Sequence, residues 1–451
     1  MMEQVKGQTG GADAAAQARK KQILEAPDTV SARRSTYYVS QRGDDANDGL
    51  SPERPRRSFE GLEALPLEAG DAVLFERGSV FRSAQKHMAH SGVYFGAYGT
   101  GDKPRIYGSL RDYADPAIWH QTEDPAVWCT PLQHTRAGIA TFNHDTLLGR
   151  WRYTRAELER DGDFYHTAEE GVFYLYFTGG NPGEYFDNIE ISTTDVAFRG
   201  SYIEDFQAEN LHFQYFTFGP FHLGEIDRVE VRGCVVGWCG GKLCGFDERR
   251  NVPSRYGNAF QVWYFGSHIT VKNCWIYQQF DAALTFQGFG EEGARFEHIC
   301  FADNLIEYCC MNIEFWAGRA TDKRPPHIDH ILYKGNLIRF AGYGWGGLQR
   351  CKKENQGSLL GWYNLYEDLH DFVITENVLD CADCALIYTK SPKEQAGLTV
   401  TDNTYYQKTP SGIHDYVEIV KGLSFRPTGA EALEQAIATF DAHPRLVKWL
   451  G

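Results

Sequence analysis

Four short segments in the second half of the chain alternate apolar residues with polar or aromatic ones. They are residues 259–263, 283–287, 312–316 and 385–389. If each segment is a strand, the residues that point inward are Phe260, Leu284, Ile313 and Leu386. Alternation then turns Gln261, Thr285 and Glu314 outward, as neighbours on one sheet face. A carboxylate, amides and an indole on one face are typical of a sugar subsite, because carboxylates do the acid/base or nucleophilic work of glycosidases.

Glu314 is the predicted acid/base residue, and Asp281 is its predicted carboxylate partner. Apolar neighbours should leave Glu314 partly buried, which would raise its pKa toward the value that a general acid needs. Asp281 precedes Thr285 by roughly 13 Å of extended strand. Glycosidase carboxylates are about 5–9.5 Å apart, so this pairing requires a bend, and Asp247 or Glu248 are alternative partners. Two plainer interpretations remain open: Glu314 faces solvent, and Asp281 caps a turn.

Side chains near these segments carry further groups that bind sugar hydroxyls or stack on sugar rings. The predicted substrate-binding residues are Arg255, Asn258, Gln261, Gln287, Trp316, Trp345, Gln349 and Arg350. Amides hydrogen-bond to hydroxyl groups, and indole faces pack on rings. Arg350 would also suit a lyase, as its base or as a ligand for a substrate carboxylate, although an ion pair with a neighbouring acid is the simpler explanation.

The cysteines and acidic turns give little support for a metal site. Cys381 and Cys384 have the spacing of a zinc ligand pair, but no second pair or His-x-His motif completes four ligands. The acidic turn of Asp44, Asp45, Asn47 and Asp48 does not match the EF-hand pattern of glycine and distal glutamate. We therefore predict no metal and no cofactor. The 11 cysteines are expected to be free thiols, with Cys234, Cys274 and Cys381 buried.

An internal repeat indicates the fold that positions these residues. The repeats begin at Val229, Ile269, Ile299, Ile331, Phe372 and Leu398. Their sixth positions are Cys234, Cys274, Asn304, Asn336, Asn377 and Asn403. Alternating apolar residues make a short strand, and Asn tolerates the left-handed or bent conformation of a corner. A unit this short cannot form a closed core by itself. We therefore predict that the units stack into an all-β, right-handed parallel β-helix with a ladder of asparagines.

The amino-terminal third carries a second set of fold signals. These are YYVS at 37–40, DANDG at 45–49 followed by SPE and Pro55, GDAVLFERG at 70–78 and AYGTGDKPRI at 97–106. Here the chain resembles the amino-terminal cap and first coils of the pectate-lyase-like right-handed parallel β-helix superfamily, and the resemblance extends over about residues 36–407. It implies the fold and a carbohydrate-active enzyme such as a glycoside hydrolase or polysaccharide lyase. Because these helices also host epimerases and non-catalytic proteins, the activity has to be argued from the site.

We expect three parts along the chain. Residues 1–35 are predicted to form a tail or cap helix, and residues 36–410 the β-helix, with an insertion rich in polar aromatic residues at about 110–200. Residues 411–451 are predicted to end in a capping helix, because residues 431–450 have helical periodicity. Solenoids need such a cover over their last coil.

Charge and composition narrow the partners. The 451 residues carry a formal net charge of −15, which argues against a nucleic-acid partner. Apolar runs are too short to cross a membrane, and the amino terminus lacks the apolar region of a secretion signal, so we expect a cytoplasmic protein. The predicted function is a glycoside hydrolase acting on oligosaccharides in a groove on the helix side. The alternatives are a polysaccharide lyase or epimerase acting on a uronate, and a non-catalytic carbohydrate-binding β-helix. The sequence does not indicate an oligomeric state.

Overall fold

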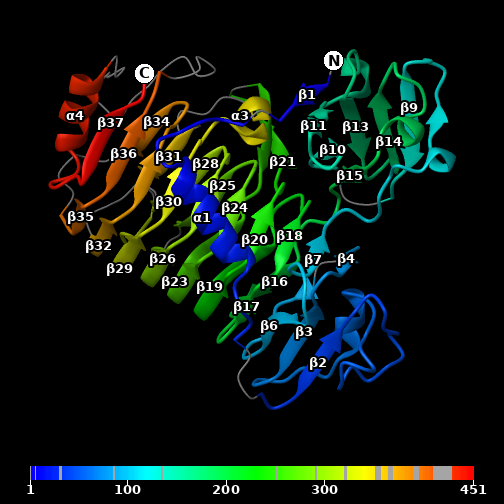
Figure 1. Cartoon of the computed structure of the whole chain (residues 1–451), viewed down its shortest axis with the longest axis horizontal. Coiled ribbons are helices and arrows are strands. Elements are labelled where there is room, and N and C mark those ends of the chain that lie inside the picture. Colours follow the sequence, from blue (N-terminus) through cyan, green and yellow to red (C-terminus); the bar gives the residue numbers. More distant parts are fainter. Residues whose placement is uncertain are drawn as a thin grey trace.

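The structure is a computed structural model that describes residues 2–5, 7–29, 33–84, 87–133, 136–249, 251–289, 292–318, 322–350, 357–363, 369–389, 396–409 and 429–451. Its main body is a parallel β-helix, as predicted, with the coils stacked side by side (Figure 1). A typical coil contributes one strand to each of three stacks. We call these stacks sheets A, B and C, in their chain order within a coil.

Sheet A contains β2 (Thr36–Val39), β3 (Ala72–Glu76), β6 (Tyr94–Tyr98), β17 (Gln207–Glu209), β19 (Phe221–Arg232), β23 (Phe260–Lys272), β26 (Arg295–Ala302), β29 (His327–Lys334), β32 (Leu369–Thr375) and β35 (Leu398–Thr401). Sheet B contains β4 (Val80–Arg82), β7 (Arg105–Tyr107), β18 (His212–Gln214), β20 (Val235–Gly237), β24 (Trp275–Tyr277), β27 (Leu305–Glu307), β30 (Leu337–Arg339), β33 (Val378–Asp380), β36 (Thr404–Gln407) and β37 (Leu446–Trp449). Sheet C contains β5 (His87–Met88), β16 (Phe198–Ser201), β25 (Ala282–Gly288), β28 (Met311–Ala317), β31 (Ser358–Tyr363), β34 (Ala385–Thr389) and the first halves of β19 and β23. Because β19 and β23 run through the corner, sheets A and C form one hydrogen-bonded sheet.

The corner between sheets A and B holds the predicted ladder. All six sixth-position residues are buried, which confirms the repeat. Asn304 Nδ2 donates to Asn336 Oδ1 at 2.9 Å, and Asn336 Nδ2 donates to Asn377 Oδ1 at 2.9 Å. Asn377 Nδ2 continues the series to Asn403 Oδ1 at 3.0 Å. The amides therefore satisfy one another from coil to coil, which compensates for burying them.

The left-handed conformation at this corner belongs to the residue before each ladder position, which corrects the sequence interpretation. The residues with positive φ are Gly233, Asn273, Asp303, Gly335, Glu376 and Asp402. Their φ values lie between 52° and 66°. The ladder asparagines are therefore selected for their hydrogen bonds, and the turn itself is made one residue earlier.

The core is a set of rings and aliphatic side chains stacked along the helix. Phe286, Phe315 and Trp362 stack on successive coils, with ring centroids 5.3 and 5.4 Å apart. One inward prediction was out of register: Ile387, and not Leu386, pairs with Leu360 in the inward row. Both side chains are buried in the core cluster. The register could not be predicted because the 385–389 strand has no polar residue at its centre that would identify its outward face.

The carboxyl-terminal end of the helix is covered by α4 (Ala430–Ala438), seen on the left of Figure 1. Leu433, Ala436 and Ile437 bury its inner face in the core. After the helix, Asp441 ends the ladder by accepting hydrogen bonds from Asn403 and from the Tyr405 hydroxyl. The helical prediction for residues 431–450 was too long, because residues 446–449 form strand β37 and extend sheet B.

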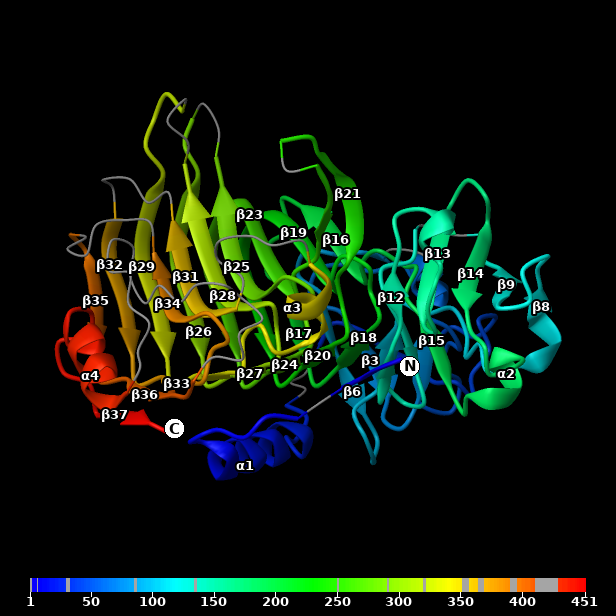
Figure 2. The same ribbon diagram turned by 90° about the horizontal axis from the view of Figure 1, so that it is seen from above.

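Several further elements lie beside the coils. The helix α1 (Asp13–Leu24) lies along the outer face of sheet B, where Ala16 and Ile23 pack on Leu305 and Leu337 (Figure 2). The 3₁₀ turn η1 (Glu60–Ala64) packs its buried Leu62 into the first coils. The hairpin of β21 (Lys242–Asp247) and β22 (Val252–Tyr256) projects next to sheet C, and α3 (Trp345–Gln349) lies beside it (Figure 2).

Between sheets B and C the chain inserts two small, mainly antiparallel sheets. One contains β8 (His120–Gln121), β9 (Val127–Pro131), β12 (Arg150–Trp151), β13 (Asp163–Thr167) and β14 (Val172–Tyr176). The other contains β1 (Glu3–Gln4), β10 (Ala140–Phe142), β11 (Leu147–Leu148) and β15 (Ile189–Ile191). The short turns η2 (Pro116–Ile118), η3 (Arg155–Glu157) and α2 (Pro182–Tyr185) complete this insertion. It has its own apolar core, and Ile139 and Leu148 join it to Tyr107 and Tyr215 of the β-helix.

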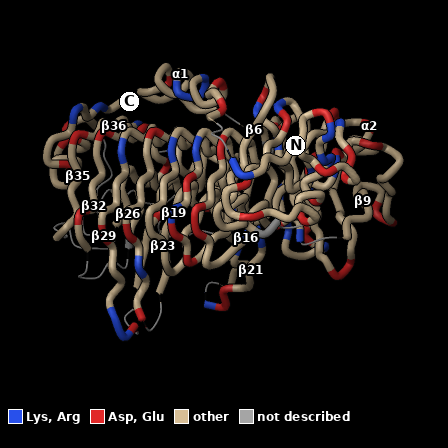
Figure 3. Tube along the Cα trace, turned by 90° about the horizontal axis from the view of Figure 1, so that it is seen from below, with Lys and Arg blue, Asp and Glu red and all other residues tan. Residues whose placement is uncertain are grey.

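The surface carries no simple charge pattern. Lys and Arg are interspersed with Asp and Glu along the coils (Figure 3). Among the described helices, none has the length and apolar character needed to cross a bilayer.

Candidate functional site

The outer face of sheet C brings the predicted polar row together. Gln261 pairs with Thr285 and Thr285 with Glu314 on three successive strands, as the alternation predicted. All three residues are at most 5% exposed, so Glu314 is more deeply buried than expected. Among the described residues, the Thr285 hydroxyl has no hydrogen-bond partner. A buried polar group without a partner costs about 1–3 kcal/mol, so the centre of this row is poised to accept one.

Asp281 and Arg350 form a buried ion pair at one end of the row. Their side chains are 5% and 3% exposed, and the guanidinium contacts the Asp281 carboxylate directly. Burial alone lowers the pKa of Arg350, but the negative fields of Asp281, Cys310 and Glu314 outweigh it and hold that pKa above its usual value. Arg350 is therefore a fixed cation that contacts Asp281 and lies in the field of Glu314. A guanidinium held in this way is unsuited to take up a proton, which argues against its role as a lyase base.

An aromatic cluster lies at the other end of the row. The Trp316 indole N–H donates to Gln287 Oε1, and both residues belong to adjacent strands. Trp316 also stacks on Phe289, with ring centroids 5.8 Å apart, and meets the edge of Trp263 at 6.0 Å. Trp263 was missed by the sequence analysis, although it shares a register position with Gln287 and the same alternation would have found it.

Two of the predicted binding residues brace the strands and turns of this face. Asn258 Nδ2 donates to Gln261 Oε1 at 2.6 Å, and its Oδ1 accepts from the backbone N–H of Ala282 at 2.9 Å. Arg255 is buried and donates to the carbonyls of Gly241 and Gly138 at 2.9 and 2.7 Å. These bonds orient Gln261 and hold the insertion against the coil.

Two other predicted binding residues connect α3 to its surroundings. Trp345 is 1% exposed, and its indole N–H donates to the Gln278 carbonyl at 2.6 Å, so it presents no ring face to a ligand. Gln349 donates to the Gly149 carbonyl at 2.8 Å.

The alternative carboxylates Asp247 and Glu248 lie at the tip of the β21–β22 hairpin, where Asp247 accepts from the Arg249 N–H at 3.1 Å.

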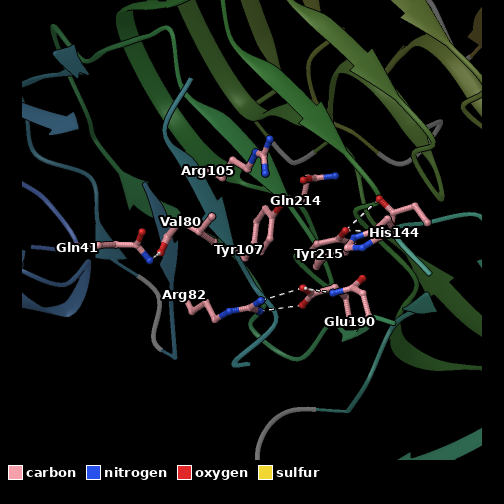
Figure 4. Close-up of a pocket in the computed structure, with 11 residues that line it drawn as sticks. Gln41, Val80, Arg82, Arg105, Tyr107, His144, Glu190, Gln214 and Tyr215 are labelled. Atoms are coloured by element: carbon pink, nitrogen blue, oxygen red, sulfur yellow. Dashed lines mark hydrogen bonds and ion pairs between the residues drawn. The ribbon is translucent and has the colours of Figure 1, made fainter. Parts of the chain in front are cut away.

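A separate cavity of about 520 Å³ lies on the outer side of sheet B, roofed by the insertion (Figure 4). Its lining residues are Gln41, Val80, Arg82, Arg105, Tyr107, His144, Asp145, Asn188, Glu190, Gln214 and Tyr215. None of them was predicted from the sequence. They come from segments as distant as residues 41 and 215, and no local spacing joins them.

Two carboxyl groups in this cavity have opposite surroundings. Glu190 accepts two hydrogen bonds from the Arg82 guanidinium, both at 2.8 Å. Asp145 accepts from the Tyr215 hydroxyl at 2.9 Å, yet burial raises its pKa to about 6, against the effect of the hydroxyl groups that bond to it. Glu190 is thus paired with a cation, whereas Asp145 has no cationic partner among the described residues of this cavity and its pKa is raised by burial.

The cysteines match the expectation where it can be compared. Cys234, Cys274 and Cys381 are buried and free. Cys384 is also buried, and Cys381 and Cys384 lie at a turn of their coil. No group of three or more candidate metal ligands occurs among the residues that the structure describes.

Comparison with known proteins gives similarity of backbone only. No family model and no curated protein matches the chain. Among solved structures, XylC in complex with xylose is 12% identical with a TM-score of 0.48, over 83% of this chain and 65% of that one. A glycoside hydrolase is 10% identical with a TM-score of 0.46, over 92% and 96% of the two chains. Pectate lyase Pel9A is 12% identical with a TM-score of 0.43, over 84% and 70%. The function therefore has to be argued from the side chains.

Proposed function

We propose that this protein is a carbohydrate-active enzyme, and specifically a glycoside hydrolase that acts on an oligosaccharide at the outer face of sheet C. The observation that carries the proposal is the buried row of Gln261, Thr285 and Glu314, with an unpartnered hydroxyl at its centre. A substrate hydroxyl would supply the partner that Thr285 lacks. The Trp263–Trp316 edge lies alongside, where a sugar ring would stack.

The two carboxylates take different roles in this proposal. Asp281 contacts Arg350 directly, and we assign it the role of nucleophile or base. Glu314 is buried between Thr285 and Gly361 of the neighbouring strands, and we assign it the role of general acid, which would pass a proton to the leaving oxygen. Arg350 couples the two groups and would keep their combined charge low.

The ion pair also bears on the alternatives. A lyase or epimerase would need a cation open to the substrate carboxylate, and Arg350 already contacts Asp281 in a buried pair. The hydrolase is thus favoured over these two. A non-catalytic carbohydrate-binding β-helix would use the same face without turnover, and the experiment below separates the two.

The test is a screen of nitrophenyl glycosides and neutral oligosaccharides with wild type, Glu314→Gln and Asp281→Asn. Turnover by the wild type should fall at least ~10²-fold in each variant, the low end for losing an acid or base group. Glu230→Gln is the matched control, because Glu230 lies on a strand of sheet A, is partly exposed and pairs with Lys272 at the surface. Full activity in Glu314→Gln would exclude Glu314 as the acid. Binding without turnover by the wild type would favour the non-catalytic alternative.

A further inference from the structure

We propose that the cavity on sheet B is a second binding site, which takes a neutral saccharide of one or two residues. This inference goes beyond the proposed function and does not depend on it. The cavity is lined by sheet B and the insertion, and none of its lining residues belongs to sheet C. Its volume of about 520 Å³ is within the range of about 300–1,000 Å³ that small-molecule sites occupy.

The floor of the cavity is built by strand register. Arg82, Tyr107 and Gln214 are direct neighbours on β4, β7 and β18, so alternation places all three on the outer face. Gln214 Nε2 donates to the Tyr277 hydroxyl at 3.0 Å, two strands away. Tyr277 reaches across because the intervening position is Gly237, where a Cβ would lie 2.2 Å from its ring. The amide and phenol groups of the floor are thus held in place before any ligand arrives.

The roof is a turn held in an unusual conformation. Asn143, His144 and Asp145 all have positive φ, at 49°, 53° and 66°. Each such non-glycine residue costs roughly 1 kcal/mol, and consecutive ones are rare. The turn brings the Asp145 carboxyl to the Tyr215 hydroxyl, at 2.9 and 3.0 Å. The fold therefore maintains a strained turn that presents a carboxyl group to the cavity.

The charges of the lining favour a neutral ligand. Arg82 and Glu190 neutralise each other in a two-bond pair, which Figure 4 shows along one side of the cavity. Arg105 donates to the exposed Asp102 at 3.1 Å. An anionic ligand would meet the carboxyl groups of both Glu190 and Asp145. The amide nitrogens of Gln41, Asn188 and Gln214 already donate within the protein, so a sugar would meet mainly their amide oxygens, which accept hydrogen bonds.

The aromatic walls complete the case for a sugar. Tyr107 and Tyr215 meet edge to face, with ring centroids 5.0 Å apart. Burial raises the pKa of Tyr107 to about 12, so its hydroxyl remains a donor across the physiological range. Because burial raises the pKa of Asp145 to about 6, its carboxyl group mainly accepts hydrogen bonds at pH 7 and becomes a donor as the pH falls below 6. The apolar ring faces suit the C–H face of a sugar, and the hydroxyl and carboxyl groups suit its hydroxyl groups.

The experiment is saturation-transfer NMR at pH 7 with D-glucose, D-galactose, D-xylose, lactose and cellobiose. D-Glucuronate and inorganic phosphate are the anionic probes. Val80→Trp fills the cavity from its floor, and Gln214→Leu removes the central amide. Each should weaken binding of the responding neutral sugar at least tenfold. Val373→Trp is the matched control, because Val373 is a partly exposed valine on a strand of sheet A, away from the cavity.

The outcomes separate this proposal from the proposed function. Transfer to a neutral sugar that survives Glu314→Gln and is lost in Val80→Trp and Gln214→Leu supports the cavity site. The proposal is overturned if no neutral sugar responds, if only glucuronate or phosphate responds, or if binding survives both cavity variants. Loss of binding in Glu314→Gln alone would place the sugar on sheet C, and would support the proposed function while contradicting this one. Melting curves verify that each variant is folded.

Discussion

The outer faces of sheets B and C both carry polar residues at alternating strand positions, but they differ in where their charged groups lie and how these groups are paired. On sheet C, Asp281 contacts the Arg350 guanidinium, Glu314 contributes to the field on it, and the whole row is buried. On sheet B, Arg82 and Glu190 cancel each other, and Asp145 is left with a pKa of about 6 beside an open volume. The first arrangement preserves charge in a buried place, as transition-state stabilisation requires. The second combines a balanced ion pair with a titrating carboxyl group beside an open volume, which suits the neutral ligand that we propose for the cavity.

We expect the largest effect, a loss of folding stability, from a substitution that removes the cation from the buried ion pair on sheet C. Arg350→Met removes the partner of Asp281 and leaves a carboxylate buried without compensation. Losing one member of a buried pair costs about 3–5 kcal/mol, so the free energy of unfolding in urea should fall by that amount. Arg295→Met is the control, because Arg295 pairs with Glu297 at an exposed position and its loss should cost less than about 1 kcal/mol.

A smaller loss from Arg350→Met would contradict the view that this pair is sealed from solvent. The double variant Asp281→Asn/Arg350→Met sharpens the test. It removes both charges, so it should recover part of the stability that the single variant loses.

The second prediction concerns catalysis on the same face. Glu314→Gln keeps the size and hydrogen bonding of the side chain but removes its proton, so kcat should fall at least ~10²-fold. Its free energy of unfolding should change by less than about 1 kcal/mol, because no volume is lost. A matching fall in stability and activity would mean that Glu314 is a structural residue.

The row on sheet C could be predicted because its members lie at one strand position of successive coils. Period-two alternation alone places Gln261, Thr285 and Glu314 together. The same logic failed by one residue at Leu386, since a wholly apolar strand carries no mark of its outward face. It also placed the left-handed turn on the ladder asparagines, whereas the turn lies one residue earlier.

The cavity on sheet B was beyond such logic for two reasons. Its floor uses residues of the first coils, where the repeat is not visible in the sequence. Its roof belongs to the insertion, and the contact between Asp145 and Tyr215 spans 70 residues of irregular chain. In addition, the left-handed turn at residues 143–145 contains no glycine, the residue that most often indicates such a turn in a sequence. Pairings of this kind depend on how two separately folded parts meet, and sequence patterns describe each part alone.

The third prediction uses pH to sharpen the comparison on sheet B. The pKa of Asp145 is raised from 3.8 to about 6, so the folded state binds its proton more tightly than the unfolded state. The resulting stability is fully present below about pH 4 and is lost as pH rises through 6. Asp145→Asn cannot titrate. Between pH 4.5 and 8, wild type should therefore lose about 2 kcal/mol relative to this variant.

The groups that face Asp145 also titrate or carry charge, and both proteins contain them. They are Glu190, Arg82, Arg105, His144, Tyr107 and Tyr215. Their contributions cancel in the difference between wild type and variant. Asp402→Asn is the control, because Asp402 is another left-handed aspartate but lies at the ladder corner. Parallel stability curves for wild type and Asp145→Asn would show that the carboxyl group is not enclosed.

We expect the smallest effect from substitutions at the aromatic edge of sheet C, which test whether this edge stabilises the fold or binds a ligand. Trp316→Phe keeps a ring against Phe289 but removes the N–H that donates to Gln287, so the free energy of unfolding should fall by about 1 kcal/mol. Trp128→Phe is the control, because the Trp128 indole N–H has no partner among the described residues and its loss should cost nothing on that account. If the edge also stacks on a sugar, Trp316→Ala should raise KM well beyond Trp316→Phe, since only the alanine variant removes the ring face. Equal KM values in the two variants would mean that this edge is packing alone, and that substrate is held by the Gln261–Glu314 row without it.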